Sequence, residues 1–301
     1  MVGICTGRTV IITGAARGLG RSYALAFAAE GANVVVNDIG TSLTGEGRDT
    51  SAADAVVAAI QAAGGRAIAN HEDIADWDAA KRIVDATIAA FGGLDVVVNN
   101  AGIVRDRMFV SAAPEEWDAT MHVHLRGHFC LSRHAVDYWR AQQKAGKAVD
   151  ARIINTSSGA GLQGSIAQAA YSTAKGGIAA LTLVQAAELG RYGITANALA
   201  PAARTRMTEG AFADKMAKVD TGFDKQDPDN IAPTVVWLGS AQSAHVTGCV
   251  FELEGGRITI ETGWNLGPTV ERDCRWRPRE VGDAVNLLLA ERPAPRRVWG
   301  S

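Results

Sequence analysis

Residues 13–20 have the sequence Thr-Gly-Ala-Ala-Arg-Gly-Leu-Gly. This stretch follows a short apolar run, Thr9–Ile12, and leads into a segment where Leu19, Tyr23 and Phe27 recur at helical spacing. Glycines at such a junction allow a tight turn, close approach of a phosphate and close packing of a helix on a strand. The helix N-terminus adds free N–H groups and partial positive charge. We therefore predict a phosphate-binding loop, with candidate contacts Gly14, Arg17, Gly18, Leu19 and Gly20.

Outward from this loop, short runs rich in valine and isoleucine alternate with alanine-rich stretches of helical length. That alternation is typical of strand–helix–strand units around a parallel sheet. The sequence predicts an α/β fold with a doubly wound, seven-stranded parallel sheet in one domain, residues 1–256, followed by a C-terminal extension, residues 257–301. The predicted strands are Thr9–Ile12, Asn33–Asn37, Ala67–Ala69, Asp95–Asn99, Arg152–Asn155, Thr195–Ala198 and Val250–Leu253.

Two stretches depart from the alternation. Residues 202–229 are long for a loop in a compact domain, so we expect a substrate lid with short helices there. In the extension, apolar side chains recur at helical spacing and must be buried on this subunit or on a partner. These side chains are Val281, Val285, Leu288 and Leu289.

Charge and composition exclude several classes of partner. The formal net charge of the 301 residues is -2, so no general basic field attracts nucleic acid or an anionic membrane. No apolar run is long enough to span a bilayer. The four cysteines are far apart and form neither a C-x-x-C pair nor a disulfide framework, which is typical of a reducing compartment. A soluble cytoplasmic protein is the expectation.

Asp38 closes the second predicted strand, where a carboxylate accepts hydrogen bonds from ribose hydroxyls and repels a 2′-phosphate. This position favours NAD over NADP as cofactor. Arg17 argues the other way, because a guanidinium beside the loop pairs well with a 2′-phosphate. We give Asp38 more weight because it is nearer and less mobile. Asp73 and Ile74 follow the third strand and are expected to contact the adenine, although Asp73 is equally suited to cap the next helix.

Tyr171 and Lys175 lie four residues apart at the start of a long helical pattern, so the phenol and the ammonium share one face. Free tyrosine titrates near 10 and is a poor base at neutral pH. A lysine cation and a positive nicotinamide ring would both lower the tyrosine pKa. Ser158 ends the fifth strand, where its hydroxyl can bond the reacting oxygen. The three groups form a candidate catalytic set.

The chain resembles the short-chain dehydrogenase/reductase family over about residues 5 to 256. The resemblance rests on motifs that occur in the family's order: the glycine-rich loop, Asp38, the segment Asn99–Gly102, and the set of Ser158, Tyr171 and Lys175. The resemblance implies a Rossmann fold and hydride transfer between a nicotinamide cofactor and a hydroxyl/carbonyl pair. It assigns Ser158 to substrate orientation, Tyr171 to acid/base chemistry and Lys175 to ribose binding. It also places Asn100, Ala101, Gly102 and Pro201 beside the cofactor, with Ala202 where glycine is usual.

His124 departs from the family pattern, in which asparagine supports a proton-relay water. A histidine there can bond water, and its protonation is then expected to enter the pH profile. Together with other segments, it makes the chain resemble the dehydrogenase part of peroxisomal multifunctional beta-oxidation enzymes. Those segments are Asn37–Gly40 with the insertion that runs to Asp49, Val104–Arg107, and Ala200–Pro201 leading to Arg206–Thr208.

The resemblance implies NAD-dependent oxidation of a (3R)-3-hydroxyacyl-CoA to the 3-oxoacyl-CoA. Two alternatives stay open at this point. In the first, the enzyme acts on a hydroxysteroid or another secondary alcohol, since the fold does not fix the substrate. In the second, the chain binds NAD without catalysing a reaction. The family usually forms homodimers or homotetramers, through helices around Trp117–His134 and Thr173–Arg191. His124 and His128 have metal-ligand spacing, but no carboxylate or cysteine completes a ligand set, so we expect no metal.

Overall fold

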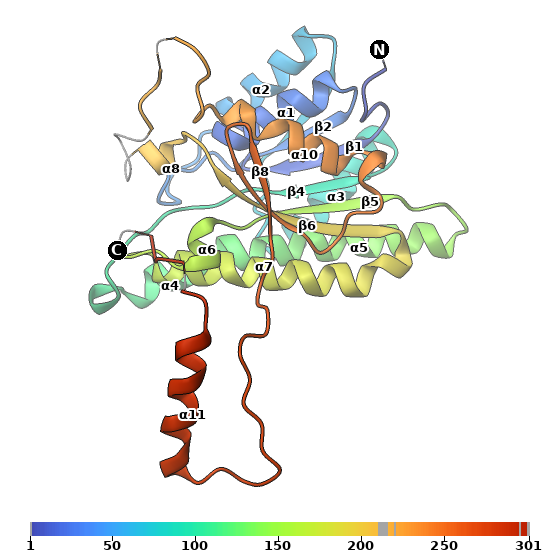
Figure 1. Cartoon of the computed structure of the whole chain (residues 1–301). Helices are drawn as coiled ribbons and strands as arrows, with labels where there is room; N and C mark the ends of the chain where they lie inside the picture. The colour runs from blue at the N-terminus through green and yellow to red at the C-terminus, as the bar shows by residue number, and fades with distance from the viewer. Residues whose placement is uncertain (1, 210–215, 220, 295, 300–301) are drawn as a thin grey trace.

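The computed structural model describes residues 2–209, 216–219, 221–294 and 296–299. These residues form one eight-stranded sheet at the centre of the molecule (Figure 1). The strands are β1 (Thr9–Thr13), β2 (Asn33–Asn37), β3 (Arg66–Asn70), β4 (Val96–Asn99), β5 (Ala151–Thr156), β6 (Ile194–Ala202), β7 (Val250–Glu254) and β8 (Arg257–Glu261). Their order in the sheet is β3-β2-β1-β4-β5-β6-β7-β8.

The α/β fold predicted from the sequence is confirmed, and each predicted parallel strand is present. The strand β6 runs four residues further than predicted, to Ala202, which pairs with Glu254 of β7. The predicted count of seven strands is one short, because β8 pairs antiparallel with β7 through Glu254 and Arg257. Gly255, at φ +55°, supplies the positive φ of the turn between them. The sheet thus continues past the expected domain boundary at residue 256.

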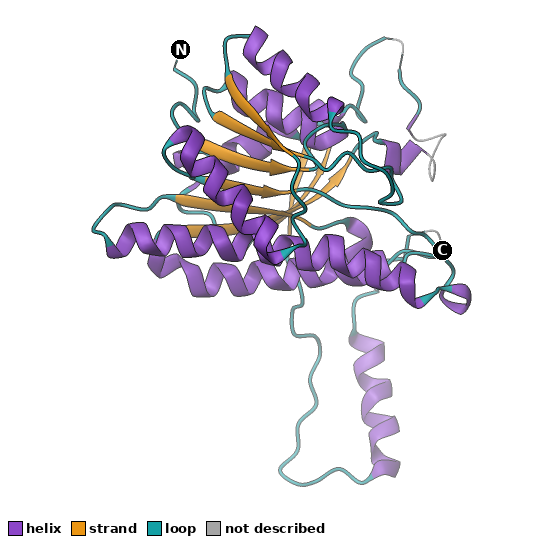
Figure 2. Ribbon diagram, turned by 180° about the vertical axis from the view of Figure 1, so that it is seen from behind, coloured by secondary structure: helices purple, strands orange, loops and turns teal. Residues whose placement is uncertain are grey.

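Helices cover both faces of the sheet (Figure 2). On one face lie α1 (Gly18–Ala29), α2 (Ser51–Ala62) and α10 (Ala232–Gly239), and on the other α3 (Trp77–Phe91), α5 (Gly127–Lys144) and α7 (Ala169–Leu189). The remaining described helices are η1 (Phe109–Ser111), α4 (Pro114–Met121), the π-helical η2 (His122–Arg126), α6 (Gly159–Gln163), η3 (Gly190–Tyr192), α8 (Arg206–Glu209), η4 (Pro228–Asn230), η5 (Ala241–Ser243) and, in the extension, α11 (Pro278–Glu291).

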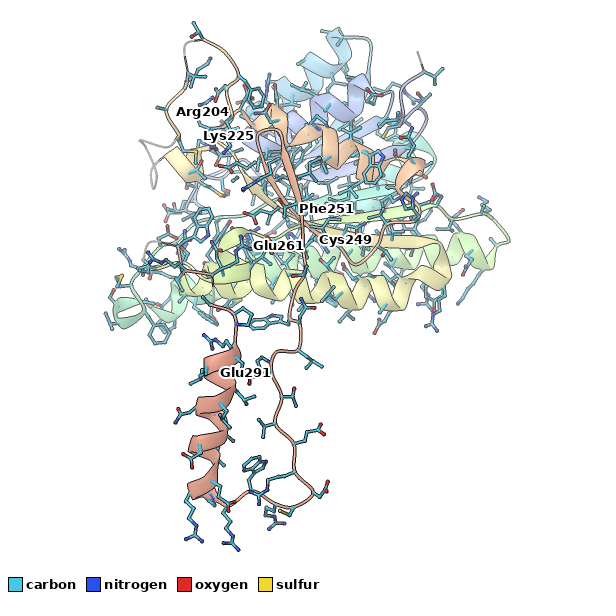
Figure 3. All side chains as sticks on the ribbon, viewed as in Figure 1. Arg204, Lys225, Cys249, Phe251, Glu261 and Glu291 are labelled. Atoms are coloured by element: carbon cyan, nitrogen blue, oxygen red, sulfur yellow. The ribbon has the colours of Figure 1, made fainter. Side chains whose placement is uncertain are left out.

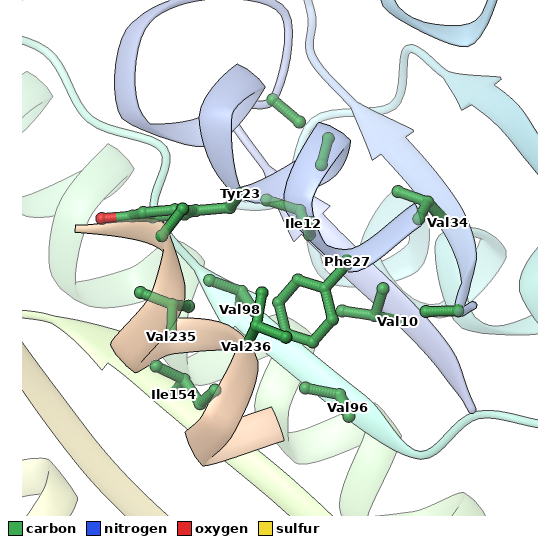
Figure 4. Packing of buried hydrophobic residues seen from close by; sticks show 14 of the residues in the cluster. Val10, Ile12, Tyr23, Phe27, Val34, Val96, Val98, Ile154, Val235 and Val236 are labelled. Carbon is green, nitrogen blue, oxygen red and sulfur yellow. The ribbon is translucent and has the colours of Figure 1, made fainter. Parts of the chain in front are cut away.

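Alternate side chains of the central strands enter two separate hydrophobic cores. Val10 and Ile12 of β1 pack with Phe27 of α1 in one core, which Figure 4 shows. Ile11, between them, joins Ile83 of α3 in the core on the opposite face. This period of two explains why the strands are apolar at nearly every position. Full burial of each such side chain contributes roughly 1.5–3 kcal/mol, and the two cores fix the strand ends that carry the candidate site.

Part of the predicted lid lies outside the described residues, namely 210–215 and 220. Of residues 202–229, the structure describes a short helix at the start, α8, and the single turn η4 near the end. Arg204 forms a bidentate ion pair with Asp224, which joins the two sides of this segment. The described part is therefore anchored at its base. Within the described residues, no helix combines the length and apolar character needed to cross a bilayer.

The extension leaves the body after β8 and returns to it near its end. Figure 3 shows both connections, one at Glu261 and the other at Glu291 of α11, with the helix pointing away from the body. No described residue of α11 is buried. Of the four apolar positions that were expected to be covered, three are open within this subunit, with Val281 41%, Val285 42% and Leu289 53% exposed, whereas Leu288 is half-buried. This subunit therefore leaves three of the four positions uncovered.

Candidate active site

A cavity of about 400 Å³ opens at the carboxyl ends of the parallel strands, beside the point where the strand order reverses between β1 and β4. Open α/β sheets bind ligands at this position because the flanking loops diverge there. Every residue proposed from the sequence for catalysis or cofactor binding lines this one cavity: Gly14, Arg17, Gly18, Leu19, Gly20, Asp38, Asp73, Ile74, Asn100, Ala101, Gly102, His124, Ser158, Tyr171, Lys175 and Pro201.

The glycine-rich loop packs too closely for side chains. A Cβ atom on Gly20 would lie 2.1 Å from the carbonyl oxygen of Gly14. A Cβ on Gly14, whose φ is +62°, would lie 2.8 Å from the Cα of Ala101 in the turn after β4. Asn100 joins the same two segments, since its Nδ2 donates to the carbonyl oxygens of Thr13 at 2.9 Å and Gly14 at 3.2 Å. The loop and the turn therefore form one rigid wall.

The N-terminus of α1 faces the cavity as an anion site. Its N-cap residue, Arg17, makes no side-chain capping hydrogen bond, and the first turn contains no acidic residue. The first amides of an α-helix have no partner within the helix, so those of Gly18, Leu19 and Gly20 are available to a ligand. A pyrophosphate suits these donors and the glycine cradle beside them. The residues present thus fit a nicotinamide dinucleotide.

Asp38 is held by backbone donors at one end of the cavity. Its Oδ1 accepts from the amide of Gly40 at 2.8 Å and its Oδ2 from the amide of Ala16 at 3.0 Å. Asp73 accepts from the amide of Ala75 at 2.8 Å within its own turn, whereas Asp76 caps α3. The capping alternative for Asp73 is therefore wrong, and its carboxylate lines the cavity.

Ser158, Tyr171 and Lys175 meet at the other end. Ser158 lies two residues after β5 and is the N-cap of α6. Its Oγ accepts from the amide of Ala160 at 3.2 Å, and its side chain also hydrogen-bonds Tyr171. Tyr171 and Lys175 lie on the first two turns of α7, with the Lys175 Nζ 5.6 Å from the centroid of the tyrosine ring. Nζ donates to the carbonyl oxygen of Thr156 at 2.7 Å. The sequence spacing thus places three functional groups within reach of one another.

Burial opposes charge on both of these ionisable groups. It lowers the pKa of Lys175 from 10.5 to about 7. Burial also raises the pKa of Tyr171; the hydrogen bond from Ser158 works against this rise and the Asp106 carboxylate adds to it. From the sequence, Lys175 and a nicotinamide ring are together expected to lower the pKa of Tyr171. In the protein alone, loss of solvation is the larger effect.

His124 is buried and faces Tyr171, with 5.3 Å between the ring centroids and perpendicular ring planes. Its Nε2 lies 2.8 Å from the carbonyl oxygen and 3.1 Å from the amide nitrogen of Ile103. Burial lowers its pKa from 6.5 to about 3, and the positive charge of Lys175 adds to this shift. The histidine is neutral at physiological pH. So low a pKa argues against the expectation that protonation of His124 enters the pH profile near neutrality. Its cause, the complete desolvation of the ring, is not visible in the sequence.

The insertion after β2 also lines the cavity, through Thr41, Ser42, Leu43 and Gly45, and the sequence did not predict this role for it. The predicted lid lines the cavity as well, through Ala203 and residues 205–208. The insertion crosses to the segment after β4, because the amide of Val104 donates to the Leu43 carbonyl oxygen at 3.0 Å. Its position after the C-terminal end of a parallel strand was the available signal, since loops at that edge carry function. Among the described residues, no group of three or more His, Cys, Asp or Glu is placed to hold a metal.

Comparison with protein families gives one match over most of the chain: the family described as short chain dehydrogenase matches residues 8–216. Among curated proteins, the chain is 43% identical over 291 residues to hydroxyacyl-CoA dehydrogenase ChsB1 of Mycobacterium tuberculosis, covering 95% of this chain and 90% of that protein. It is 42% identical over 252 residues to mouse peroxisomal multifunctional enzyme type 2, covering 84% of this chain but only 32% of the mouse protein.

A solved structure shares the fold almost throughout. The crystal structure of a short chain dehydrogenase from Mycobacterium avium superposes with a TM-score of 0.89 at 55% sequence identity. The match covers 99% of this chain and 100% of that one, so it includes the C-terminal extension.

Proposed function

We propose, from the premise that this chain belongs to the short-chain dehydrogenase family, that it oxidises a (3R)-3-hydroxyacyl-CoA to the 3-oxoacyl-CoA with NAD as electron acceptor. As a family member it is an oxidoreductase acting on CH–OH groups. One observation carries the proposal: Ser158, Tyr171 and Lys175 converge in the cavity that the glycine-rich loop also lines. The acyl-CoA substrate is supported by the name of the M. tuberculosis relative and by the likeness to the peroxisomal enzymes.

The reaction takes a proton from the substrate hydroxyl and a hydride from its carbon. When bound, the nicotinamide dinucleotide supplies the hydride acceptor. In this mechanism Ser158 donates a hydrogen bond that orients the substrate oxygen, and the Tyr171 phenolate removes the hydroxyl proton. Lys175 lies one helical turn behind the tyrosine, where its charged form stabilises the phenolate and binds the ribose. The buried walls exclude water, which strengthens each of these interactions.

The preference for NAD rests on Asp38. Its two oxygens accept from the backbone amides of Gly40 and Ala16, which fixes the carboxylate in the cavity wall. A fixed carboxylate accepts from ribose hydroxyls and repels the phosphate that distinguishes NADP. We further propose that the enzyme is a cytoplasmic homodimer or homotetramer, with contacts through the helices α4, α5 and α7.

A matrix of substrates and cofactors tests this proposal. The purified enzyme is assayed for reduced cofactor at 340 nm with a (3R)-3-hydroxyacyl-CoA, its (3S) epimer and a free hydroxysteroid, each with NAD and with NADP. We expect the highest kcat/KM for the (3R) thioester with NAD. A higher kcat/KM for the hydroxysteroid would replace the proposed substrate while leaving the catalytic set in place. Absence of turnover with every pair would contradict an enzymatic function.

A further inference from the structure

Arg17 is paired with a carboxylate that does not line the cavity. Its Nη2 lies 3.0 Å from Oδ2 of Asp49, at the end of the insertion that follows β2. Among the described residues that line the cavity, the lysines and arginines are Arg17, Lys175 and Arg206. Lys175 lies beside Tyr171, and Arg206 belongs to α8. Arg17 follows Ala16, whose amide binds Asp38, so it is the cation of the Asp38 end.

Hydrogen bonds hold Asp49 in place independently of its ion pair with Arg17. Its Oδ1 accepts from the amide of Ser51 at 3.1 Å and from the Ser51 hydroxyl at 2.5 Å. Its own amide donates to the carbonyl oxygen of Gly40 at 2.8 Å. Gly40 has φ +77°, and a Cβ there would lie 2.1 Å from the Asp49 carbonyl oxygen, so the neck of the insertion closes tightly at these two residues. The remaining oxygen, Oδ2, is the one that faces Arg17.

A chain of contacts joins Asp38 to Arg17 at this end of the cavity. Asp38 accepts from Gly40, Gly40 binds Asp49, and Asp49 pairs with Arg17. The hydrogen bonds from Ser51, followed by the charge of Arg17, hold the pKa of Asp49 below its usual value, so it is ionised at neutral pH. Asp38 lines the cavity and Asp49 does not, so the Arg17 guanidinium is paired with the carboxylate outside the cavity.

We propose that Asp49 is a specificity-determining residue, which holds the Arg17 guanidinium away from the ribose 2′ position and so excludes a 2′-phosphate. A phosphate dianion in a protein site requires a charged donor, and arginine is the side chain best suited to it. With Arg17 engaged by Asp49, a 2′-phosphate meets Asp38 without compensation. Asp49 thus acts through Arg17 and not by touching the cofactor. The inference rests on the proposed use of NAD.

The test substitutes Asp49→Asn, which removes the charge and keeps an oxygen for the Ser51 contacts. Two quantities are measured for the wild type and the variant: kcat/KM with NAD and NADP, and the Kd of NADPH from the fluorescence of the bound nucleotide. We expect kcat/KM with NADP to rise about tenfold and the Kd of NADPH to fall about tenfold, the range of one charge-assisted hydrogen bond. The value with NAD should stay within about twofold, because the Asp38 contacts are unchanged.

Two companion variants decide whether the effect is local. Asp54→Asn removes a nearby exposed charge from α2, whose partner is His71, and should leave NADPH binding unchanged. Combining Arg17→Ala with Asp49→Asn should abolish the gain. Unchanged NADPH binding in Asp49→Asn, a gain that survives loss of Arg17, or an equal gain in Asp54→Asn overturns the role of Asp49. A wild type that already prefers NADP contradicts the proposed cofactor itself and removes the basis of the inference.

Discussion

The ionisable groups at the catalytic end show how burial sets chemistry at single residues. Lys175 has its pKa lowered to about 7 and His124 to about 3, and in both cases burial is the largest cause. For a base, a lowered pKa means that the neutral form is populated at lower pH. Near neutral pH, Lys175 therefore titrates and His124 does not.

This difference predicts the pH profile of a His124→Gln variant. The profile of kcat/KM for the dinucleotide reports ionisations of the free enzyme. Lys175 is protonated below about pH 7 and neutral above it, so it is the group expected to produce a limb there. The glutamine amide retains a donor toward Ile103, and we expect the same limb in the variant. A limb near 6.5 that is present in the wild type and lost in His124→Gln would show that the histidine titrates after all.

Residue identities in the site were predictable from the sequence, but their charge states were not. Ser158, Tyr171 and Lys175 follow a spacing that i, i+4 geometry and the strand end make informative. Their pKa values depend on how completely the surrounding chain removes water, and that is a property of the folded cavity. The role of Asp76 as the cap of α3, in place of Asp73, is decided by which carboxylate accepts from Ala79 and is likewise a feature of the folded backbone.

Among the secondary-structure elements, the glycine-rich loop and α1 pack so closely that their contact leaves no room for a side chain. Gly20 lies in the first turn of α1, and its Cβ position is 2.1 Å from the carbonyl oxygen of Gly14. Contacts this short force the loop to move. Because the same loop presents the amides that suit a pyrophosphate, its displacement should weaken cofactor binding before it disturbs the catalytic end.

We therefore predict that Gly20→Ala raises the Kd of NADH by at least about tenfold, a loss of about 1.4 kcal/mol or more. Isothermal titration calorimetry measures this directly, and thermal unfolding of the same samples separates binding from stability. The matched control is Gly190→Ala, because Gly190 has no neighbour within 4 Å of its Cβ position and has φ −54°. Equal NADH affinity in Gly20→Ala and wild type would disprove the packing argument.

Elements with strong apolar patterns were predictable, and exposed ones were not. The strands β1, β2 and β4 are buried at every position, so their runs of valine and isoleucine predict them from the sequence. The strand β8 is exposed at nearly every position and alternates polar with apolar residues, which is typical of an edge strand and gives a weaker signal. The insertion that ends at Asp49 carries no hydrophobic period, and its place across the cavity depends on contacts such as Leu43 with Val104.

In the molecule as a whole, the C-terminal extension is the segment whose apolar side chains this subunit leaves exposed. One end continues the sheet as β8. The other is held by Arg296, whose guanidinium pairs with Glu261 at 2.8 Å and Glu252 at 2.9 Å, and by Trp299, whose amide donates to Gly164 at 3.1 Å. Between the anchors, α11 exposes apolar side chains to solvent. Exposed apolar faces of this kind mark contacts between proteins.

We predict that the wild type sediments as a dimer or tetramer at micromolar concentration, and that Val285→Ser combined with Leu289→Ser lowers its apparent mass. Sedimentation velocity over a dilution series measures both. Val285 and Leu289 are 42% and 53% exposed in one subunit. Their replacement should therefore leave the fold of the subunit intact, as measured by circular dichroism. The control is Asn286→Ser on the same helix. A wild type that stays monomeric across the dilution series would contradict the prediction that α11 binds a second subunit.

Loss of the Tyr171 hydroxyl is the sharpest test that this residue is the catalytic base of a dehydrogenase. In Tyr171→Phe the ring stays in place and the phenol oxygen is lost, so turnover of the (3R)-3-hydroxyacyl-CoA with NAD should fall by about 10²–10⁴-fold, the range for loss of a general base. NADH affinity should stay within about twofold, because the loop and Asp38 are untouched. A variant that retains wild-type turnover with normal NADH binding would contradict the account.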